Sequence, residues 1–275
     1  MSLFKKVAII GTGLIGGSIG LSLKKHNLAE EVVGVSRHKK SIILAKKSGA
    51  IDDGSTTLEI IREADLVIFA TPVNIIIEFA PKIAKIIDKN CIVTDVGSTK
   101  EEIVRLLEKI FPGFVGGHPL AGSEKRSISN ASASIFQGSV CLLTPTKKTK
   151  NDSLRKVRMF WEGIGAKVVL LSASKHDKIL SLVSHLPHIA AFSLINSVPK
   201  EYLGFAAGGL KDTTRIAASD AEIWTQIFLS NRKNVLKGID VLERNLGNIK
   251  SAIKQNKKQL SIILNAAKKK RESLI

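Results

Sequence analysis

Short apolar runs alternate with longer amphipathic stretches along the first 170 residues of the chain. The runs are continuous in Val, Ile and Leu, which is typical of parallel strands that are buried on both faces. The stretches between them have the length and spacing of helices that cross over from one strand to the next. The pattern therefore predicts an α/β fold with a doubly wound parallel sheet and right-handed crossovers. The expected strands lie at 7–10, 31–35, 66–70, 92–94, 114–117, 140–144 and 167–171.

The pattern changes after residue 172, where strand-like runs give way to helical spacing. We expect helices at 174–198, interrupted by Pro187, and at 221–246, with a polar loop at 204–219 between them. An apolar stripe continues beyond the second helix, and it exceeds what a domain of about 100 residues covers by itself. We therefore predict a sheet domain at 1–172 and an all-helical domain at 173–275 that forms a two-fold homodimer. The stripe consists of Leu242, Leu246, Ile249, Ile253, Leu260 and Leu264.

The charge of the chain predicts an anionic ligand. Among 275 residues there are 42 Lys and Arg against 24 Asp and Glu, so the net charge is +18. Such a field attracts anions, but the basic residues are spread along the whole chain, and only one Tyr and two Trp accompany them. Because basic and aromatic residues do not interleave, the sequence favours a small anionic molecule over nucleic acid.

The cysteines and the apolar runs bear on the cellular setting. Cys91 and Cys141 have neither disulfide nor metal-ligand spacing, so we expect two small buried side chains and no metal site. No apolar run has the length of a membrane span, and glycines interrupt the first apolar stretch, so we expect neither a membrane anchor nor a signal peptide. The expected location is the cytoplasm.

A glycine motif follows the first expected strand and opens a helix. Its first glycine permits the tight turn, its second lets the backbone approach a pyrophosphate, and its third lets helix and strand pack closely. The start of the helix offers free N–H groups to the phosphates. This context predicts dinucleotide binding by a Rossmann-type domain. The motif consists of Gly11, Thr12, Gly13, Leu14, Ile15 and Gly16.

The end of the second expected strand bears on the choice of cofactor. Sites selective for NAD usually have an acidic residue here to bind the ribose 2′-hydroxyl. This chain has Ser36 and Arg37 instead, and a hydroxyl and a guanidinium suit a 2′-phosphate. The sequence therefore favours NADP, with NAD also possible. Thr71 and Pro72, after the run at 66–70, are further candidates for cofactor contact.

Polar side chains follow two more of the expected strands. Ser98 comes after the run at 92–94, and His118 comes after the run that begins at 114. Because the carboxyl ends of parallel strands line the ligand crevice, both residues are site candidates. Ser98 with Glu101 also fits a capping box, so Ser98 is alternatively a helix cap. His118 is alternatively a buried, hydrogen-bonded histidine.

The helical half contains two further candidate segments. Ser-His-Leu-Pro-His occupies 184–188, where Pro187 removes a backbone hydrogen bond and lets nearby groups point into a cleft. Arg215 lies in the polar loop, just before a helix-start signature at 219–222. A single guanidinium in a helical domain suits a carboxylate ligand, and the alternative is a surface turn.

Four of these separated segments together resemble prephenate and arogenate dehydrogenases, the enzymes of the tyrosine pathway. They are Val-Gly-Ser-Thr-Lys at 96–100, Gly-Gly-His-Pro-Leu-Ala-Gly at 116–122, Ser-His-Leu-Pro-His at 184–188 and Lys-Asp-Thr-Thr-Arg at 211–215. The resemblance covers nearly the whole chain. It implies oxidative decarboxylation of a cyclohexadienyl acid, prephenate or arogenate, with hydride transfer to NAD(P), and a homodimer formed through the helical domain.

The resemblance also implies roles for individual residues. It implies that His118 accepts the proton of the ring 4-hydroxyl as hydride leaves C4, and that Ser98 orients this imidazole and contacts the same hydroxyl. It further implies that Arg215 binds the ring carboxylate and that His185 helps to shape the substrate pocket. The other pocket positions carried over are Ser123, Glu124 and Trp224, the last of which is alternatively a core aromatic residue.

Two other functions compete with this interpretation. One is a two-domain dehydrogenase of 3-hydroxy acids, which generally relies on a lysine in the helical domain, but no lysine here has a context comparable to that of His118. The other is a regulator that senses a dinucleotide and binds nucleic acid, which the charge of +18 keeps open. A regulator needs a recognition helix or a basic groove, and the sequence indicates neither.

Overall fold

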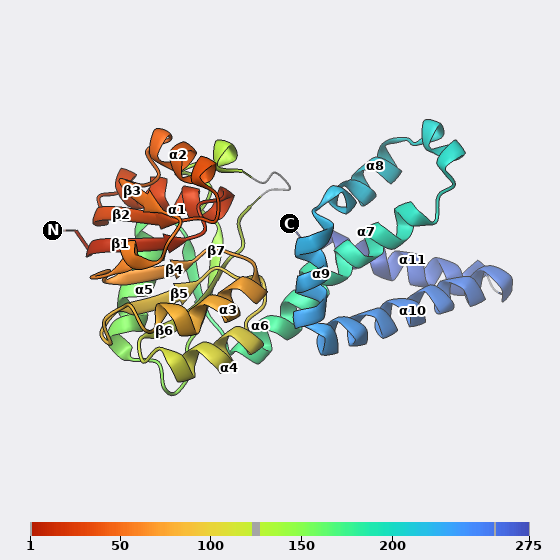
Figure 1. Ribbon diagram of the computed structural model, residues 1–275. Helices are drawn as coiled ribbons and strands as arrows, with labels where there is room; N and C mark the ends of the chain where they lie inside the picture. The colour runs from red at the N-terminus through yellow and green to blue at the C-terminus, as the bar shows by residue number, and fades with distance from the viewer. Residues whose placement is uncertain (1, 123–126, 256, 275) are drawn as a thin grey trace.

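The computed structural model describes residues 2–122, 127–255 and 257–274. A sheet half, up to residue 172, is followed by a helical half from residue 173 onward, and the two lie next to each other (Figure 1). The sheet has the strand order β3-β2-β1-β4-β5-β6-β7-β8. Its strands are β1 (Phe4–Ile10), β2 (Ala29–Val35), β3 (Asp53–Ser55), β4 (Leu66–Phe69), β5 (Ile92–Asp95), β6 (Phe114–Pro119), β7 (Val140–Thr144) and β8 (Lys167–Leu170).

Helices cover both faces of the sheet, as the continuous apolar strands predict. Along β1, Val7 and Ile9 point into one core cluster while Ala8 and Ile10 point into the other. The first cluster packs on α1 and α5, and the second on α3 and α4. The predicted doubly wound α/β fold is therefore confirmed. The helices of this half are α1 (Leu14–Lys25), α2 (Lys39–Lys47), α3 (Val73–Ile83), α4 (Glu101–Ile110) and α5 (Asn151–Gly163).

Two strands differ from the prediction. The short strand β3 was not expected, because its sequence Asp-Gly-Ser has no apolar run, yet it pairs with the end of β2. The sheet is also not wholly parallel, because β6 and β7 pair antiparallel. In the described residues between these two strands the only regular element is a single 3-10 turn at Ile128–Asn130, and a parallel return needs a longer crossover connection.

The helical half begins with one continuous helix that has an irregular centre. It runs through α6 (Ala173–Leu180), a π-helical turn (Ser181–His185) and α7 (Leu186–Asn196). The π turn lies directly before Pro187, so it accommodates the missing hydrogen bond that was expected to interrupt the helix. The remaining helices are α8 (Gly208–Thr214), α9 (Ala221–Ser230), α10 (Arg232–Gln255) and α11 (Lys257–Glu272).

Two expectations for this half are wrong in detail. The expected helix at 221–246 is broken at Asn231, whose side chain turns away to donate to the backbone oxygen of Asp177 at 2.8 Å. The expected polar loop at 204–219 is largely helical, because α8 and a 3-10 turn at Arg215–Ala218 occupy it. The hydroxyls of Thr213 and Thr214 bond to carbonyls one turn earlier, which supports this short helix.

The continuous helix Ala173–Asn196 also corrects the expectation that no segment has the length of a membrane span. It has 24 residues and a mean hydropathy of 1.4 in its most apolar window, of which 22% is buried. By length and composition alone it is able to cross a bilayer, as are many core helices of soluble proteins. Its first turns bury His176 and Asp177, two polar residues that face the sheet half.

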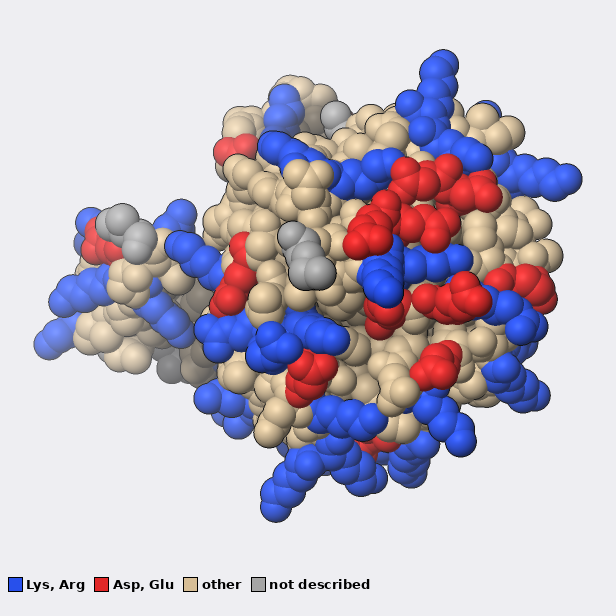
Figure 2. Space-filling model, turned by 90° about the vertical axis from the view of Figure 1, so that its left-hand side faces the viewer, with Lys and Arg blue, Asp and Glu red and all other residues tan. Residues whose placement is uncertain are grey.

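The charged residues follow no single stripe on the face shown in Figure 2. Lysine and arginine side chains lie around this face, with acidic side chains between them. The excess of positive charge is therefore dispersed on this side of the molecule, as the distribution of basic residues along the sequence predicts.

Candidate active site

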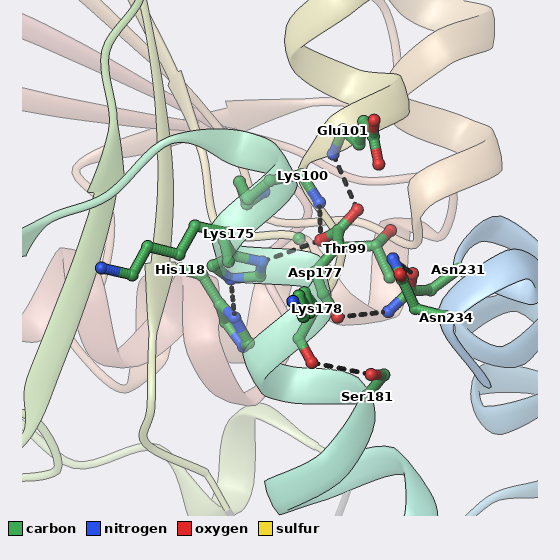
Figure 3. Close-up of polar contacts among 12 residues, drawn as sticks. Thr99, Lys100, Glu101, His118, Lys175, Asp177, Lys178, Ser181, Asn231 and Asn234 are labelled. Carbon is green, nitrogen blue, oxygen red and sulfur yellow. Dashed lines mark hydrogen bonds and ion pairs between the residues drawn. The ribbon is translucent and has the colours of Figure 1, made fainter. Parts of the chain in front are cut away.

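The candidate catalytic residues lie where helix α6 crosses the carboxyl ends of β5 and β6. His118 is near the end of β6, and its Nδ1 lies 2.8 Å from Nε2 of His176 on α6. Nδ1 of His176 in turn lies 2.8 Å from Oδ1 of Asp177. Both α6 residues are buried, whereas His118 keeps partial exposure. The three side chains form a hydrogen-bonded row that joins the sheet half to the helical half (Figure 3).

Asp177 also caps helix α4, although it is more than 70 residues away in the sequence. Its carboxylate accepts from the backbone N–H of Lys100 at 2.8 Å and from that of Glu101 at 2.9 Å (Figure 3). No side chain from the segment before α4 caps this helix within the described part of the chain. A carboxylate at a helix N-terminus is stabilised by free N–H groups and by the helix dipole. The α4 terminus therefore fixes Asp177, and through it His176.

A buried ion pair fixes the loop between β5 and α4. Asp95 and Lys100 form this pair, and both side chains are 0% exposed. Asp95 also accepts from the backbone N–H of Gly97 at 2.8 Å and from that of Gly117 at 3.2 Å. Gly117 precedes His118 on β6, so the pair ties the loop at 96–100 to the strand that carries the imidazole. The pair also compensates two charges that would be very costly to bury alone.

The electrostatics of the row keep its histidines neutral. Burial, together with the nearby His176, Lys100 and His185, holds the pKa of His118 well below its usual value. Burial also lowers the pKa of His176, although Asp177 opposes that effect. For Asp177, burial alone raises the pKa, but hydrogen bonds from His176, Glu101 and Lys100 leave it below the usual value. At neutral pH the row therefore holds two neutral imidazoles and one carboxylate.

Aromatic rings of the helical half extend the site away from the sheet. Trp224 on α9 stacks on His188, with ring centroids 3.5 Å apart, and meets His185 edge-on at 6.1 Å. His185 is only 1% exposed, and its Nδ1 lies 3.3 Å from Nδ2 of Asn231. Burial lowers the pKa of His185 to about 4. Of the two histidines in this motif, His188 is thus the more accessible, while His185 supports Trp224 from below.

Arg215 is exposed beside this ring cluster and close enough to His188 to lower the pKa of that imidazole, after the larger effect of burial. It forms no ion pair with any residue that the structure describes. An unpaired guanidinium next to a stacked imidazole and indole is suited to a ligand that has a carboxylate and a planar ring. Figure 1 shows the helices α8 and α9 that flank this position.

Ser98 has neither of the contacts expected of it. It is half-buried in the β5–α4 loop, and its hydroxyl makes no hydrogen bond with a described residue. The capping alternative is wrong, because Asp177 takes the helix terminus. The orienting contact to His118 is made by His176 instead.

Two further expectations concern other segments. Asp220 and not Ser219 caps α9, accepting from the backbone N–H of Ile223 at 3.1 Å. Ser123 and Glu124 lie outside the described residues.

The loop from β1 to α1 has the shape of a dinucleotide cradle. Gly11 has a φ of +102°, and a Cβ there would lie 2.5 Å from the backbone oxygen of Ala70. A Cβ on Gly16 would lie 1.9 Å from the oxygen of Gly11, so the helix packs directly on the turn. At Gly13 a Cβ meets nothing within 4 Å, and α1 begins without a side-chain cap from the described residues. The loop therefore fits a pyrophosphate bound by backbone N–H groups.

The remaining cofactor candidates surround this loop. Ser36 and Arg37 follow β2, with Arg37 exposed and its Nε 3.3 Å from Nε2 of His38. Thr71 and Pro72 follow β4, which pairs with β1. The methyl group of Thr71 lies 2.8 Å from the position of a Cβ on Gly11, so this residue lines the glycine turn.

His176 and Asp177 were not predicted from the sequence. The signal available was a histidine and an aspartate side by side, four and five residues after Ser172, whose side chain caps helix α6. The Asp95–Lys100 pair was not predicted either, although Lys100 ends the segment 96–100 that was singled out and Asp95 directly precedes it. The partners of His176 and Asp177 come from β6 and from the start of α4, and no local pattern identifies them.

Comparisons with known proteins agree on one group of enzymes. The family model described as the nucleotide-binding domain of prephenate dehydrogenase matches residues 19–170, and the model described as its dimerization domain matches residues 172–265. A prephenate dehydrogenase of Bacillus subtilis (strain 168) is 35% identical over 260 residues, which cover 90% of this chain and 70% of that protein. A cyclohexadienyl dehydrogenase of Zymomonas mobilis is 34% identical over 266 residues, covering 92% and 90% of the two chains.

A solved structure extends this similarity to three dimensions. The crystal structure of prephenate dehydrogenase from A. aeolicus, in complex with hydroxyphenyl propionate and NAD+, matches this chain with a TM-score of 0.94. The two chains are 36% identical, and the match covers 98% of each. The similarity therefore includes both the sheet half and the helical half.

Proposed function

The chain belongs to the prephenate dehydrogenase family, and on that premise we propose that His118 is the general base of its reaction and Arg215 the group that binds the ring carboxylate. The enzyme is an NAD(P)-dependent oxidoreductase that catalyses oxidative decarboxylation in tyrosine biosynthesis. This activity replaces the two competing functions, the 3-hydroxy acid dehydrogenase and the nucleic-acid-binding regulator. We propose prephenate as its preferred substrate, on the strength of the relatives bearing that name at 35% and 36% identity.

The observation that carries the proposal is the placement of one neutral imidazole at the junction of the two halves. His118 lies near the carboxyl end of β6. The cofactor loop begins at the carboxyl end of β1, on the same side of the sheet. Burial and neighbouring groups keep its pKa low, so it is able to accept a proton at neutral pH. Arg215 is exposed on the helical side. A substrate with a hydroxyl at one end of a ring and a carboxylate at the other suits this arrangement.

Each residue then has one task in the reaction. The bound dinucleotide supplies the acceptor for the hydride that leaves C4 of the ring. His118 takes the hydroxyl proton as that hydride leaves, so an O–H bond breaks and an N–H bond forms on the imidazole. Arg215 holds the ring carboxylate until it departs as carbon dioxide, which returns two electrons to the ring. The ring becomes aromatic, and its oxygen recovers the proton from His118. Ser98, half-buried in the β5–α4 loop, is proposed to contact the same oxygen.

We propose the following pocket and cofactor contacts on the same basis. Trp224 and His185 form the floor of the substrate pocket, and Ser123 and Glu124, which lie outside the described residues, are assigned to the pocket from sequence alone. Ser36 and Arg37 favour NADP, because no acidic side chain ends β2 and the guanidinium is exposed. The glycine loop with Thr71 and Pro72 binds the pyrophosphate region.

We also propose that the helical half forms the homodimer. The matching model for residues 172–265 describes a dimerization domain. In the described part of this region many large apolar side chains are exposed, including Val183 at 66%, Ile253 at 67% and Phe205 at 87%. Exposed apolar area of this extent marks a protein interface.

Initial rates with four substrate pairs test the proposed function. The purified enzyme is assayed with prephenate or arogenate, each with NAD or NADP, and nicotinamide reduction is followed by absorbance. The expected result is the highest kcat/KM for prephenate with NADP. A higher value with arogenate would overturn the substrate assignment alone, and turnover of neither acid would overturn the proposed function.

A further inference from the structure

In the hydrogen-bonded row behind His118, each contact has a defined donor and a defined acceptor. This order decides which nitrogen of His118 carries the proton. We propose that His176 and Asp177 are positioning residues for the reaction, which hold His118 in the tautomer with its proton on Nδ1 and so leave Nε2 free to accept the substrate's proton. The inference rests on the proposed role of His118 as the base. It assigns a function to two residues of the helical half that neither contact the cofactor loop nor belong to the four motif segments.

The order of donors and acceptors is fixed by Asp177. An ionised carboxylate only accepts hydrogen bonds, and that of Asp177 is held in place by the backbone N–H groups of Lys100 and Glu101. Its contact with Nδ1 of His176 at 2.8 Å therefore requires a proton on that nitrogen. A buried carboxylate behind a histidine sets the tautomer in this way in hydrolytic triads as well.

His176 transmits this choice to His118. Since burial keeps His176 neutral, a proton on Nδ1 leaves a lone pair on Nε2. Nε2 lies 2.8 Å from Nδ1 of His118, and the contact is a hydrogen bond only if His118 donates. A neutral His118 that donates from Nδ1 has its lone pair on Nε2. The base is therefore ready to accept the proton without first changing its tautomer.

The same row stabilises the charge that forms when His118 takes the proton. The imidazolium carries hydrogens on both nitrogens, and the Nδ1–H bond to His176 strengthens as charge develops. Asp177 lies behind His176 with a full negative charge, whereas Lys100 is neutralised by Asp95. His185 also faces the row, and it stays neutral because burial lowers its pKa to about 4. Asp177 thus supplies the uncompensated negative charge among these groups.

The row also depends on how the two halves are docked. His118 belongs to the sheet half, while His176 and Asp177 belong to α6 of the helical half. Asn231, at the break between α9 and α10, fixes the backbone of Asp177 at 2.8 Å. The base therefore reaches its active tautomer only when α6 is seated across the ends of β5 and β6.

Two substitutions at His176 separate the hydrogen bond from the packing. Gln in His176→Gln is able to place its carbonyl oxygen near the former Nε2 and accept from His118, whereas Leu in His176→Leu fills the space and accepts nothing. Ser230→Ala is the matched control, because it removes a 3.0 Å hydrogen bond to Thr99 at the same junction without touching the row. All variants are measured as full-length enzyme with saturating cofactor, and their melting temperature and dimer state are recorded.

The expected result is a loss confined to turnover. His176→Leu should lower kcat by about 10- to 100-fold, a part of what general-base catalysis contributes, with KM changed by less than about threefold. His176→Gln should recover most of this loss, and Ser230→Ala should keep kcat within about twofold of the wild type. Equal activity of the Leu and Gln variants, or a loss in Ser230→Ala as large as in His176→Leu, would overturn the proposal.

Nitrogen NMR gives a readout that does not depend on activity. In enzyme labelled with ¹⁵N-histidine at pH 7, the resonances of His118, assigned by their loss in His118→Asn, should show the protonated type for Nδ1 and the lone-pair type for Nε2. The opposite pattern, or a mixture of tautomers that His176→Leu leaves unchanged, would overturn the inference even if one variant failed to fold. If His118→Asn retained full activity, the proposed base itself would fail, whereas a wild-type rate in a folded His176→Leu enzyme would contradict the positioning role alone.

Discussion

The sheet half and the helical half differ in how far each buries its apolar side chains. The sheet half encloses its own core, with strands such as β4 and β5 buried along their whole length. In the described part of the helical half, the buried apolar side chains are restricted to Leu180, Ala191, Ile227, Val235 and Ala252. The comparison indicates that the first half covers its own apolar core, whereas the second needs another protein surface, which we take to be a second copy of the chain.

The same division applies to chemistry. The sheet half provides the cofactor loop and the proposed base, and the helical half provides the proposed carboxylate ligand Arg215 and the ring cluster around Trp224. The row from His118 to Asp177 crosses between them. Docking of the two halves therefore completes the site, and each half can be altered separately to test this division.

The largest expected effect is on assembly. Leu246 and Ile253 are 57% and 67% exposed and lie seven residues apart on one face of α10. The double substitution Leu246→Lys with Ile253→Lys places four charges in the dimer, two per protomer, where about 1.5–3 kcal/mol of burial per side chain is lost. We expect the dissociation constant to rise by about 10³-fold or more.

Light scattering across a dilution series measures this change. Ile43→Lys is the matched control, because Ile43 is 64% exposed on α2 of the sheet half. The control should remain a dimer at micromolar concentration, while the double variant becomes monomeric. If both remain dimers, or if the wild type is itself a monomer, the two halves do not differ as described.

A smaller effect is expected at the cofactor end of the sheet half. Arg37→Ala should raise KM for NADP by about tenfold or more, because a charge-assisted hydrogen bond contributes about 1.5–3 kcal/mol. KM for NAD, which has no 2′-phosphate, should change by less than about twofold. Arg105→Ala removes an arginine of α4 that is also exposed, and it should leave both values unchanged. A wild type that prefers NAD tenfold would contradict this reading of the loop.

An effect of similar size is expected on stability, which should depend on pH through buried histidines at the junction and in the helical half. Burial lowers the pKa of His185 from 6.5 to about 4, so the unfolded chain takes up a proton at a higher pH than the folded one. Stability is therefore complete above pH 6.5 and declines as the pH falls toward 4. From pH 7 to pH 5, His185 alone should account for about 2 kcal/mol.

Urea unfolding at pH 7 and pH 5 measures this difference. The folded pKa values of His118, His176 and His188 are also lowered, so they add to the same trend. His185→Gln should reduce the pH dependence, while His38→Gln, at an exposed position of the sheet half, should not. A wild-type stability that is equal at both pH values would show that these histidines do not remain neutral in the folded protein.

The sequence allowed more to be predicted for the sheet half than for the helical half. Continuous apolar runs identify β1, β4 and β7 because strands buried on both faces need them, and the glycine loop follows from its position after β1. The strand β3 has no such run, and its pairing with β2 depends on tertiary contacts. The helices of the second half were predicted by periodicity, but the break at Asn231 depends on a hydrogen bond to a residue 54 positions away.

The candidate site divides in the same manner. His118 was predictable because it follows a strand and lies in a segment typical of a family. The contact between His118 and His176 joins residues 58 positions apart, and no local pattern indicates it. The cap of α4 shows the same limit, since Ser98 has the correct spacing for a cap but Asp177 from another helix takes its place. Local rules thus locate the polar residues, and the packing of α6 decides which of them meet.

The steady-state kinetics of His118→Asn and Arg215→Gln, measured side by side with saturating cofactor, test the division of chemistry most directly. His118→Asn keeps a hydrogen-bonding group but removes the base, so kcat should fall by about 10²-fold or more while KM changes little. Arg215→Gln removes a charge-assisted contact of about 1.5–3 kcal/mol, so KM should rise by about tenfold or more, provided that chemistry is slow relative to substrate release. The account predicts these two separate signatures. A raised KM with an unchanged kcat in His118→Asn would make His118 a binding residue and contradict the account.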